Sequence, residues 1–222
     1  MQQNISDRAY QLSQNGFYFN TSYYVRHAFD ILKQHWIILS AFTALYIAFS
    51  FLLMRAPQFG QIVQMIVSGP ISAGYYLVLH KIFSKQDYKF ENFFDGFKNF
   101  LPTMIVNMLI GLFVTVGLFL LVLPGIFLSI IYMFSMPLVV FAKLDFWPAM
   151  ESSRVIIMKQ FKQFFILGII IVGINILGVL ALGVGIFFTI PLSYAIIYLA
   201  YKDIYGMEEE TETISNDFSH FR

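Results

Sequence analysis

Cysteine is absent from this 222-residue chain, and charged residues are scarce at 12%. The absence of cysteine excludes disulfides, thiolate metal ligands and cysteine nucleophiles. A soluble domain contains roughly 25% charged residues, whereas 58% of this chain is hydrophobic. The composition therefore predicts an all-α integral membrane protein.

Four long stretches also lack Asp, Glu, Lys and Arg, namely 34–54, 56–80, 99–142 and 163–201. One membrane crossing takes about 20 helical residues, so the first two stretches predict one span each. The third would measure roughly 66 Å as a single helix. We expect it to turn back at Pro124–Gly125, because proline cannot continue the preceding helix and glycine supplies a flexible position. The fourth divides near Gly183. These divisions predict six transmembrane helices, at 36–54, 61–80, 101–122, 125–142, 163–183 and 186–204.

The distribution of basic residues predicts the orientation of these spans. Lys and Arg stay preferentially on the cytoplasmic side in short loops. With both termini inside, every Lys and Arg except Arg55 lies on the inner side, and so do all 13 acidic residues. We therefore expect an N-in, C-in topology.

The segments that precede the three predicted hairpins resemble one another. Residues 28–34 (AFDILKQ) align with 93–99 (FFDGFKN), and Leu32-Lys33-Gln34 recurs as Met158-Lys159-Gln160. A period of this kind indicates an internal repeat. We predict a single domain, 21–206, of three pseudo-repeats, each an amphipathic interfacial helix followed by a transmembrane hairpin. The interfacial helices are expected at 22–35, 89–100 and 147–160, with a polar N-terminal tail at 1–20 and an acidic, disordered tail at 207–222.

We call the three interfacial segments the collar. The first two have an apolar, aromatic-containing side at helical spacing and a charged side, as expected of a helix that lies along a membrane surface. The third is less regular, with Met150, Ile157 and Phe161 on its apolar side. Aromatic belts occur in membrane proteins generally, but interleaved basic residues would also attract anionic lipid, at about 1 kcal/mol for each cation. The collar residues that we expect to contact lipid or a partner are Phe29, Lys33, Trp36, Phe93, Phe94, Phe97, Lys98, Trp147, Arg154 and Lys159.

The second helix of each predicted hairpin contains one proline, at Pro70, Pro137 or Pro191. These prolines are expected to kink the helices for packing, and in a transport protein they would act as flexible points. Asn107 and Asn175 are polar residues within spans. They are expected to form hydrogen bonds between helices, and the alternative is that they line a substrate path.

Features that support chemistry are largely missing from the sequence. Ionisable residues inside membranes usually mark ion or proton pathways. The first five predicted spans contain no Asp, Glu, Lys or Arg, and the sixth contains only Lys202 and Asp203, at its inner end. No phosphate-binding loop, serine elbow or metal-binding helix is present. We predict no catalytic residues, no metal ligands and no cofactor, and we do not expect an enzyme.

Residues 123–159 carry a resemblance to a known family. Pro124-Gly125-Ile126, Tyr132, Asp145, Ala149, Ser153-Arg154 and Met158-Lys159 resemble a bacterial six-helix integral membrane family of unknown function, related to the membrane domain of glycerophosphodiester phosphodiesterases. The resemblance covers about residues 60–206 and implies the bacterial cytoplasmic (inner) membrane. Those enzymes carry their catalytic groups in a separate soluble domain, so it implies a fold and no reaction.

Two functions of different class follow from these features. The first is a non-enzymatic accessory or scaffold subunit that binds lipid headgroups and other membrane proteins through the collar, with no role for nucleic acid. The alternative is a permease or flippase for a lipid or small amphiphilic molecule. It would use a cleft between the repeats, lined by the polar residues of the spans.

Overall fold

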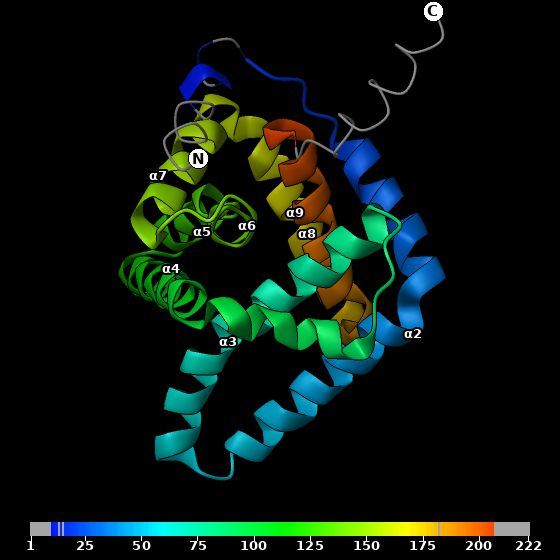
Figure 1. Ribbon diagram of the computed structural model, residues 1–222. Coiled ribbons are helices and arrows are strands. Elements are labelled where there is room, and N and C mark those ends of the chain that lie inside the picture. The colour runs from blue at the N-terminus through cyan, green and yellow to red at the C-terminus, as the bar shows by residue number, and fades with distance from the viewer. Residues whose placement is uncertain (1–9, 13, 15, 182, 207–222) are drawn as a thin grey trace, which may run out of the picture.

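The computed structural model describes residues 10–12, 14, 16–181 and 183–206 (Figure 1). Most of the predicted polar tail and all of the predicted acidic tail, 207–222, lie outside the described residues. The described part of the chain is all-helical, and its main elements are α2 (Thr21–Leu53), α3 (Pro57–Phe83), the 3₁₀ helix η1 (Phe90–Asn99), α4 (Phe100–Leu120), α5 (Val122–Ile131), α6 (Ser135–Phe141), α7 (Phe146–Lys159), α8 (Phe161–Leu180) and α9 (Ile186–Tyr205).

Five helical segments of the described chain are long and apolar enough to cross a membrane: Thr21–Leu53, Phe59–Phe83, Phe90–Leu120, Val122–Phe141 and Phe161–Leu180. The protein therefore has the character of a multi-pass membrane protein. The sixth predicted span, 186–204, corresponds to α9, which is not among the five. Four tyrosines and the charged pair Lys202–Asp203 make α9 more polar than α8.

The first predicted interfacial helix and the first predicted span form one helix, α2. It begins after Asn20, whose side chain accepts a hydrogen bond from the Tyr23 N–H and so caps the helix. At His35 the backbone leaves the helical region (φ −120°, ψ 16°), which is the boundary predicted between the two segments. The C-terminal half of α2 and the N-terminal half of α3 form a hairpin that projects from the rest of the molecule (Figure 1).

The turn of the second hairpin lies at Leu121 and not at Pro124–Gly125, so the predicted position was wrong. Leu121 is extended (φ −161°, ψ 141°), and α5 begins at the next residue. Proline needs no hydrogen-bonded N–H in the first turn of a helix, so Pro124 suits the start of α5. A Cβ on Gly117 would lie 2.9 Å from the Gly125 Cα. Gly125 therefore allows α4 and α5 to approach closely rather than supplying the turn.

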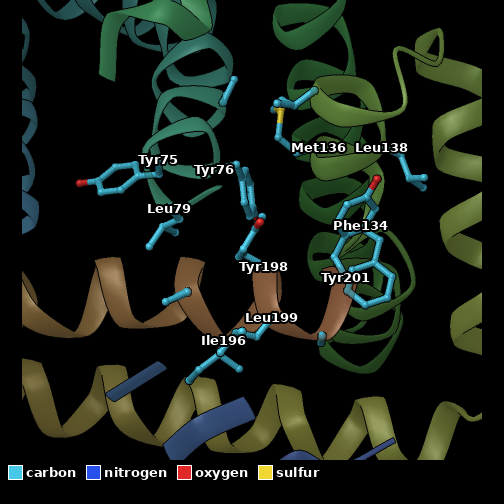
Figure 2. Packing of buried hydrophobic residues seen from close by; sticks show 14 of the residues in the cluster. Tyr75, Tyr76, Leu79, Phe134, Met136, Leu138, Ile196, Tyr198, Leu199 and Tyr201 are labelled. Carbon is cyan, nitrogen blue, oxygen red and sulfur yellow. The ribbon is translucent and has the colours of Figure 1, made fainter. Parts of the chain in front are cut away.

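The returning helices of the three hairpins, α3, α5–α6 and α9, supply most of the buried core, together with α7. Figure 2 shows Leu79 of α3, Phe134 preceding α6, and Leu199 of α9 gathered in this core. Helix α9 also packs along α2. The Tyr24 hydroxyl donates to Asp203 at 2.5 Å, and Ser40 Oγ donates to the Phe187 carbonyl at 3.1 Å. Because these contacts pair an early residue of α2 with a late residue of α9, the two helices run antiparallel.

The second collar segment is a 3₁₀ helix, η1, rather than the predicted α-helix. A 3₁₀ helix repeats every three residues, so the side that turns inward carries Phe93 and Gly96, which are both buried. The η1 backbone crosses α3 closely, since a Cβ on Gly96 would collide with the Pro70 carbonyl, and a Cβ on Gly74 with the Phe93 carbonyl. This crossing fixes which aromatic residues of the collar enter the core.

The end of the predicted N-terminal tail is packed against the protein. The ring of Phe19 lies 4.5 Å from that of Phe164, and the Gln160 side chain donates a hydrogen bond to the Phe17 carbonyl at 2.6 Å. Phe17 and Phe19 therefore cover the start of α8, whereas the Tyr18 side chain is exposed. Their aromatic character was the signal that distinguished them from the polar residues before them.

Candidate functional site: the collar and an adjoining groove

A break in the helical backbone ends each of the three collar segments. The breaks lie at His35 (φ −120°), Asn99 (φ −114°) and Gln160 (φ −129°). Asn99 and Gln160 each directly follow a collar lysine, whereas His35 lies two residues after Lys33. The chain thus leaves each collar segment in a similar way, with a lysine at the end of the segment.

The aromatic residues of the collar divide into two groups. Phe29, Trp36, Phe94 and Trp147 are about half-exposed, and Phe97 is partly buried. Phe93 is fully buried and stacks on Phe42 with ring centroids 4.0 Å apart. The first group remains available to lipid or a partner, whereas Phe93 belongs to the core. The 3₁₀ geometry of η1 separates it from Phe94.

The basic residues of the collar are all exposed, but their neighbours differ. Lys98 pairs with Asp95 at 2.7 Å, and Arg154 pairs with Glu151. Lys33 lies over the ring of Phe29, 4.5 Å from its centroid, and within the described residues it forms no ion pair. Lys159 is also exposed at the end of α7.

The ion pair on α7 changes the pKa of both partners. Hydrogen bonds from Arg154 lower the pKa of the Glu151 carboxyl below its ordinary value, and Glu151 in turn raises the pKa of Arg154. Both side chains are about half-exposed, so solvent screens the interaction and its contribution to stability is small. The pair keeps Glu151 ionised and offsets one positive charge of the collar.

A groove of about 620 Å³ adjoins the first collar segment. It lies between the first half of α2, the second half of α8 and the first half of α9. Trp36 stacks on Phe188 within its wall, with ring centroids 5.8 Å apart. The lining residues are Val25, Phe29, Leu32, Lys33, Trp36, Ile174, Leu177, Phe188, Thr189 and Leu192. The groove is thus almost wholly apolar, and Lys33 is the charged residue that lines it.

The polar residues of the predicted spans bond to neighbouring helices. Asn107 of α4 donates to Ser68 Oγ of α3 at 2.8 Å, and Asn175 of α8 donates to Ser193 Oγ of α9 at 2.7 Å. The hydroxyl of Ser72 in α3 bonds to that of Tyr194 in α9 at 2.8 Å. Three different helix pairs are joined in this way. None of these side chains lines the groove.

The prolines lie at different positions in the returning helices. Pro70 and Pro191 are buried inside α3 and α9, whereas Pro137 lies in the first turn of α6, just after the break between α5 and α6. Ser153 of α7 bridges that break, since its hydroxyl donates to the Ile131 carbonyl at 2.7 Å and accepts from the Phe134 N–H at 3.1 Å. A side chain of α7 therefore satisfies backbone groups that the break between α5 and α6 leaves free.

Sequence reasoning missed a set of four tyrosines, of which Tyr198, Tyr201 and Tyr205 are buried and Tyr194 is partly buried. Tyr194, Tyr198, Tyr201 and Tyr205 recur along α9 at intervals of four, three and four residues. Tyr198 bonds to His80 of α3 at 2.9 Å, and Tyr205 donates to the Ser152 carbonyl of α7 at 3.3 Å. The helical spacing was a signal that one side of α9 faces protein rather than lipid. These residues join the returning helices to one another and to the collar.

The described residues hold no group of three or more His, Asp or Glu side chains arranged to bind a metal ion. Comparisons with protein-family models, with curated proteins and with solved structures found no match for this chain. The resemblance to the six-helix bacterial family therefore stays a prediction.

Proposed function

We propose that this protein is a non-enzymatic accessory or scaffold subunit of the bacterial cytoplasmic membrane, which binds anionic lipid headgroups and other membrane proteins through its collar. The observation that carries the proposal is the division of each collar segment. Ala28, Phe93 and Ala149 lie in the core, whereas Lys33, Lys98 and Arg154 are exposed. Such a surface combines basic residues with half-exposed aromatic rings, which suits lipid headgroups and protein partners alike.

The proposal includes six membrane passes in three pseudo-repeats, with both termini in the cytoplasm. Support comes from the position of Arg55 as the one basic residue outside the inner segments, and from the similar backbone breaks at the ends of the three collar segments. In this arrangement α9 is the sixth pass. Its tyrosines face protein and Lys202 lies at its cytoplasmic end.

A relation to the six-helix bacterial family remains part of the proposal. The quoted motif includes Ser153, which bridges the break between α5 and α6. A packing role for this residue agrees with a family that shares a fold rather than a reaction.

A permease or flippase is the weaker hypothesis. It requires polar side chains of the spans to line one path. Asn107, Asn175 and Ser72 instead bond across three separate helix pairs, which favours a packing role for each. We therefore prefer the scaffold function.

The test compares two sets of exposed aromatic residues. One variant carries F94S and W147S in the collar, and the control carries F59S and F119S at the hairpin ends, where both rings are also exposed. Each tagged protein is extracted from its native membrane in a mild polymer, and the co-purifying proteins and lipids are quantified by mass spectrometry.

We expect the collar variant to lose about tenfold or more of a stoichiometric partner, because truncating an aromatic anchor at an interface often costs about 2 kcal/mol or more. The control should retain the partner. Equal retention by both variants, or the absence of any stoichiometric partner from the unmodified protein, would contradict the proposal.

A further inference from the structure

The groove beside α2 offers an apolar surface with one charge. Thr189, its other polar lining residue, turns its hydroxyl toward α8, since a Cβ on Gly178 would lie 2.6 Å from Thr189 Oγ1. The wall therefore presents aliphatic and aromatic atoms to an occupant. Its volume of about 620 Å³ falls within the range of pockets that enclose small ligands, about 300–1,000 Å³. These properties suit a hydrocarbon chain.

Lys33 determines which charge would be favoured on the headgroup of such a hydrocarbon chain. Its ammonium is exposed beside the groove, over Phe29, and forms no ion pair within the described part of the chain. The nearest charged residues of α2, Arg26 and Asp30, line a separate hollow with Tyr23 and His27. The groove therefore complements an occupant that has an apolar chain and an anionic group at one end.

The position of the groove favours membrane lipid as the source of that occupant. Two of the three walls, α2 and α8, belong to helices that are long and apolar enough to cross a membrane, so the groove adjoins surfaces that acyl chains would cover. We propose that the groove holds one acyl chain of an anionic diacyl phospholipid, whose phosphate pairs with the Lys33 ammonium. This inference rests on the proposed function and deepens it, because it assigns one specific lipid site to a collar that otherwise binds headgroups generally.

Trp36 makes the inference directly testable, since it lines the groove. Trp147, the only other tryptophan, is 60% exposed on α7, outside the groove. The W147F variant leaves Trp36 as a reporter, and the W36F variant leaves Trp147 as its matched control. Each full-length protein is reconstituted in phosphatidylcholine vesicles that contain a minor fraction of brominated phosphatidylglycerol or, separately, of brominated phosphatidylcholine. Quenching of tryptophan fluorescence reports which brominated chain reaches the ring.

We expect Trp36 to show an about fivefold preference for the brominated anionic lipid, the ratio that corresponds to about 1 kcal/mol for one basic residue. Trp147 should show a smaller preference or none. In the Trp36 reporter, K33Q should abolish the preference and K33R should restore it, while K98Q, which removes a lysine outside the groove, should leave it unchanged. L177F, at an exposed lining residue, should reduce quenching by both lipids because it fills the groove.

Three results would overturn the inference. Equal quenching of Trp36 by the two lipids would exclude an anionic site, and an equal preference at Trp147 would indicate general headgroup attraction by the collar. Protection of Trp36 from both lipids would mean that a protein segment fills the groove. F94S and W147S leave the groove intact, so failure of the scaffold function in the co-purification test is distinguishable from failure of the lipid site.

Discussion

The two arms of the third hairpin, α8 and α9, have the same length of 20 residues but opposite surroundings. In α8 only Phe164, Leu167 and Gly178 are buried, and many of its large aliphatic side chains are exposed. In α9 ten residues are buried. The more hydrophobic arm is thus the more exposed one, which is the reverse of a soluble protein.

Hydrophobicity and burial therefore report different environments in this molecule. Lipid chains are as apolar as leucine, so an exposed apolar helix loses little by facing them. A helix in the protein core instead uses tyrosine, serine and small residues that pack and form hydrogen bonds. The same division separates the outgoing helices α2, α4 and α8 from the returning helices α3, α5–α6 and α9.

The largest difference between α8 and α9 is expected when the same Ile→Ala substitution is made in each helix. Ile196 of α9 is fully buried, and Ile176 of α8 is 54% exposed. I196A should lower the free energy of unfolding by about 2–5 kcal/mol, because it removes packed atoms and leaves a cavity. I176A should change it by no more than about 0.5 kcal/mol. Unfolding of the reconstituted proteins by increasing SDS, followed by circular dichroism, measures both values.

Equal losses from the two substitutions would show that α8 also packs against protein, either within one chain or between copies. In that event the different exposure of α8 and α9 would not distinguish a lipid-facing helix from a protein-facing one. A Leu substitution at Ile176 provides a further check, since it preserves volume and should be neutral in lipid.

A smaller effect is expected from S153A, which tests the returning arm of the second hairpin. The substitution leaves the Ile131 carbonyl and the Phe134 N–H without their partner. Because an unsatisfied buried polar group costs about 1–3 kcal/mol, the free energy of unfolding should fall by that amount in the same SDS titration. S129A is the control, since the Ser129 hydroxyl bonds only within its own exposed turn of α5. Equal effects of S153A and S129A would contradict a bridging role for Ser153.

Sequence reasoning reached the helical class and the multi-pass character because both depend on charge-free length and composition. It misplaced the second turn, because Pro124 can begin a helix as readily as it ends one. The spacing of Phe93, Phe94 and Phe97 predicts one side of an α-helix, but the 3₁₀ geometry of η1 turns Phe93 into the core. Sequence periodicity did not reveal that change of helix type.

The groove could not be predicted from the sequence either. Trp36 and Phe29 were recognised as collar residues, but Ile174 and Phe188 come from the third hairpin. Their meeting depends on the antiparallel packing of α2 on α9, which is fixed by contacts such as Tyr24 with Asp203. Long-range pairs of this kind have no local signature.

The smallest effect is expected at the hydrogen bond that joins the two arms of the third hairpin. N175L removes the donor that reaches Ser193 Oγ, and contacts of this kind are worth about 0.6–2 kcal/mol. The Ser193 hydroxyl keeps its bond to the Thr189 carbonyl of its own helix, so the loss should lie near the lower value. A double-mutant cycle with S193A in the SDS titration isolates the interaction. Additive effects of the two substitutions would mean that α8 is held to α9 by packing alone, and that lipid and protein environments meet there without a polar contact.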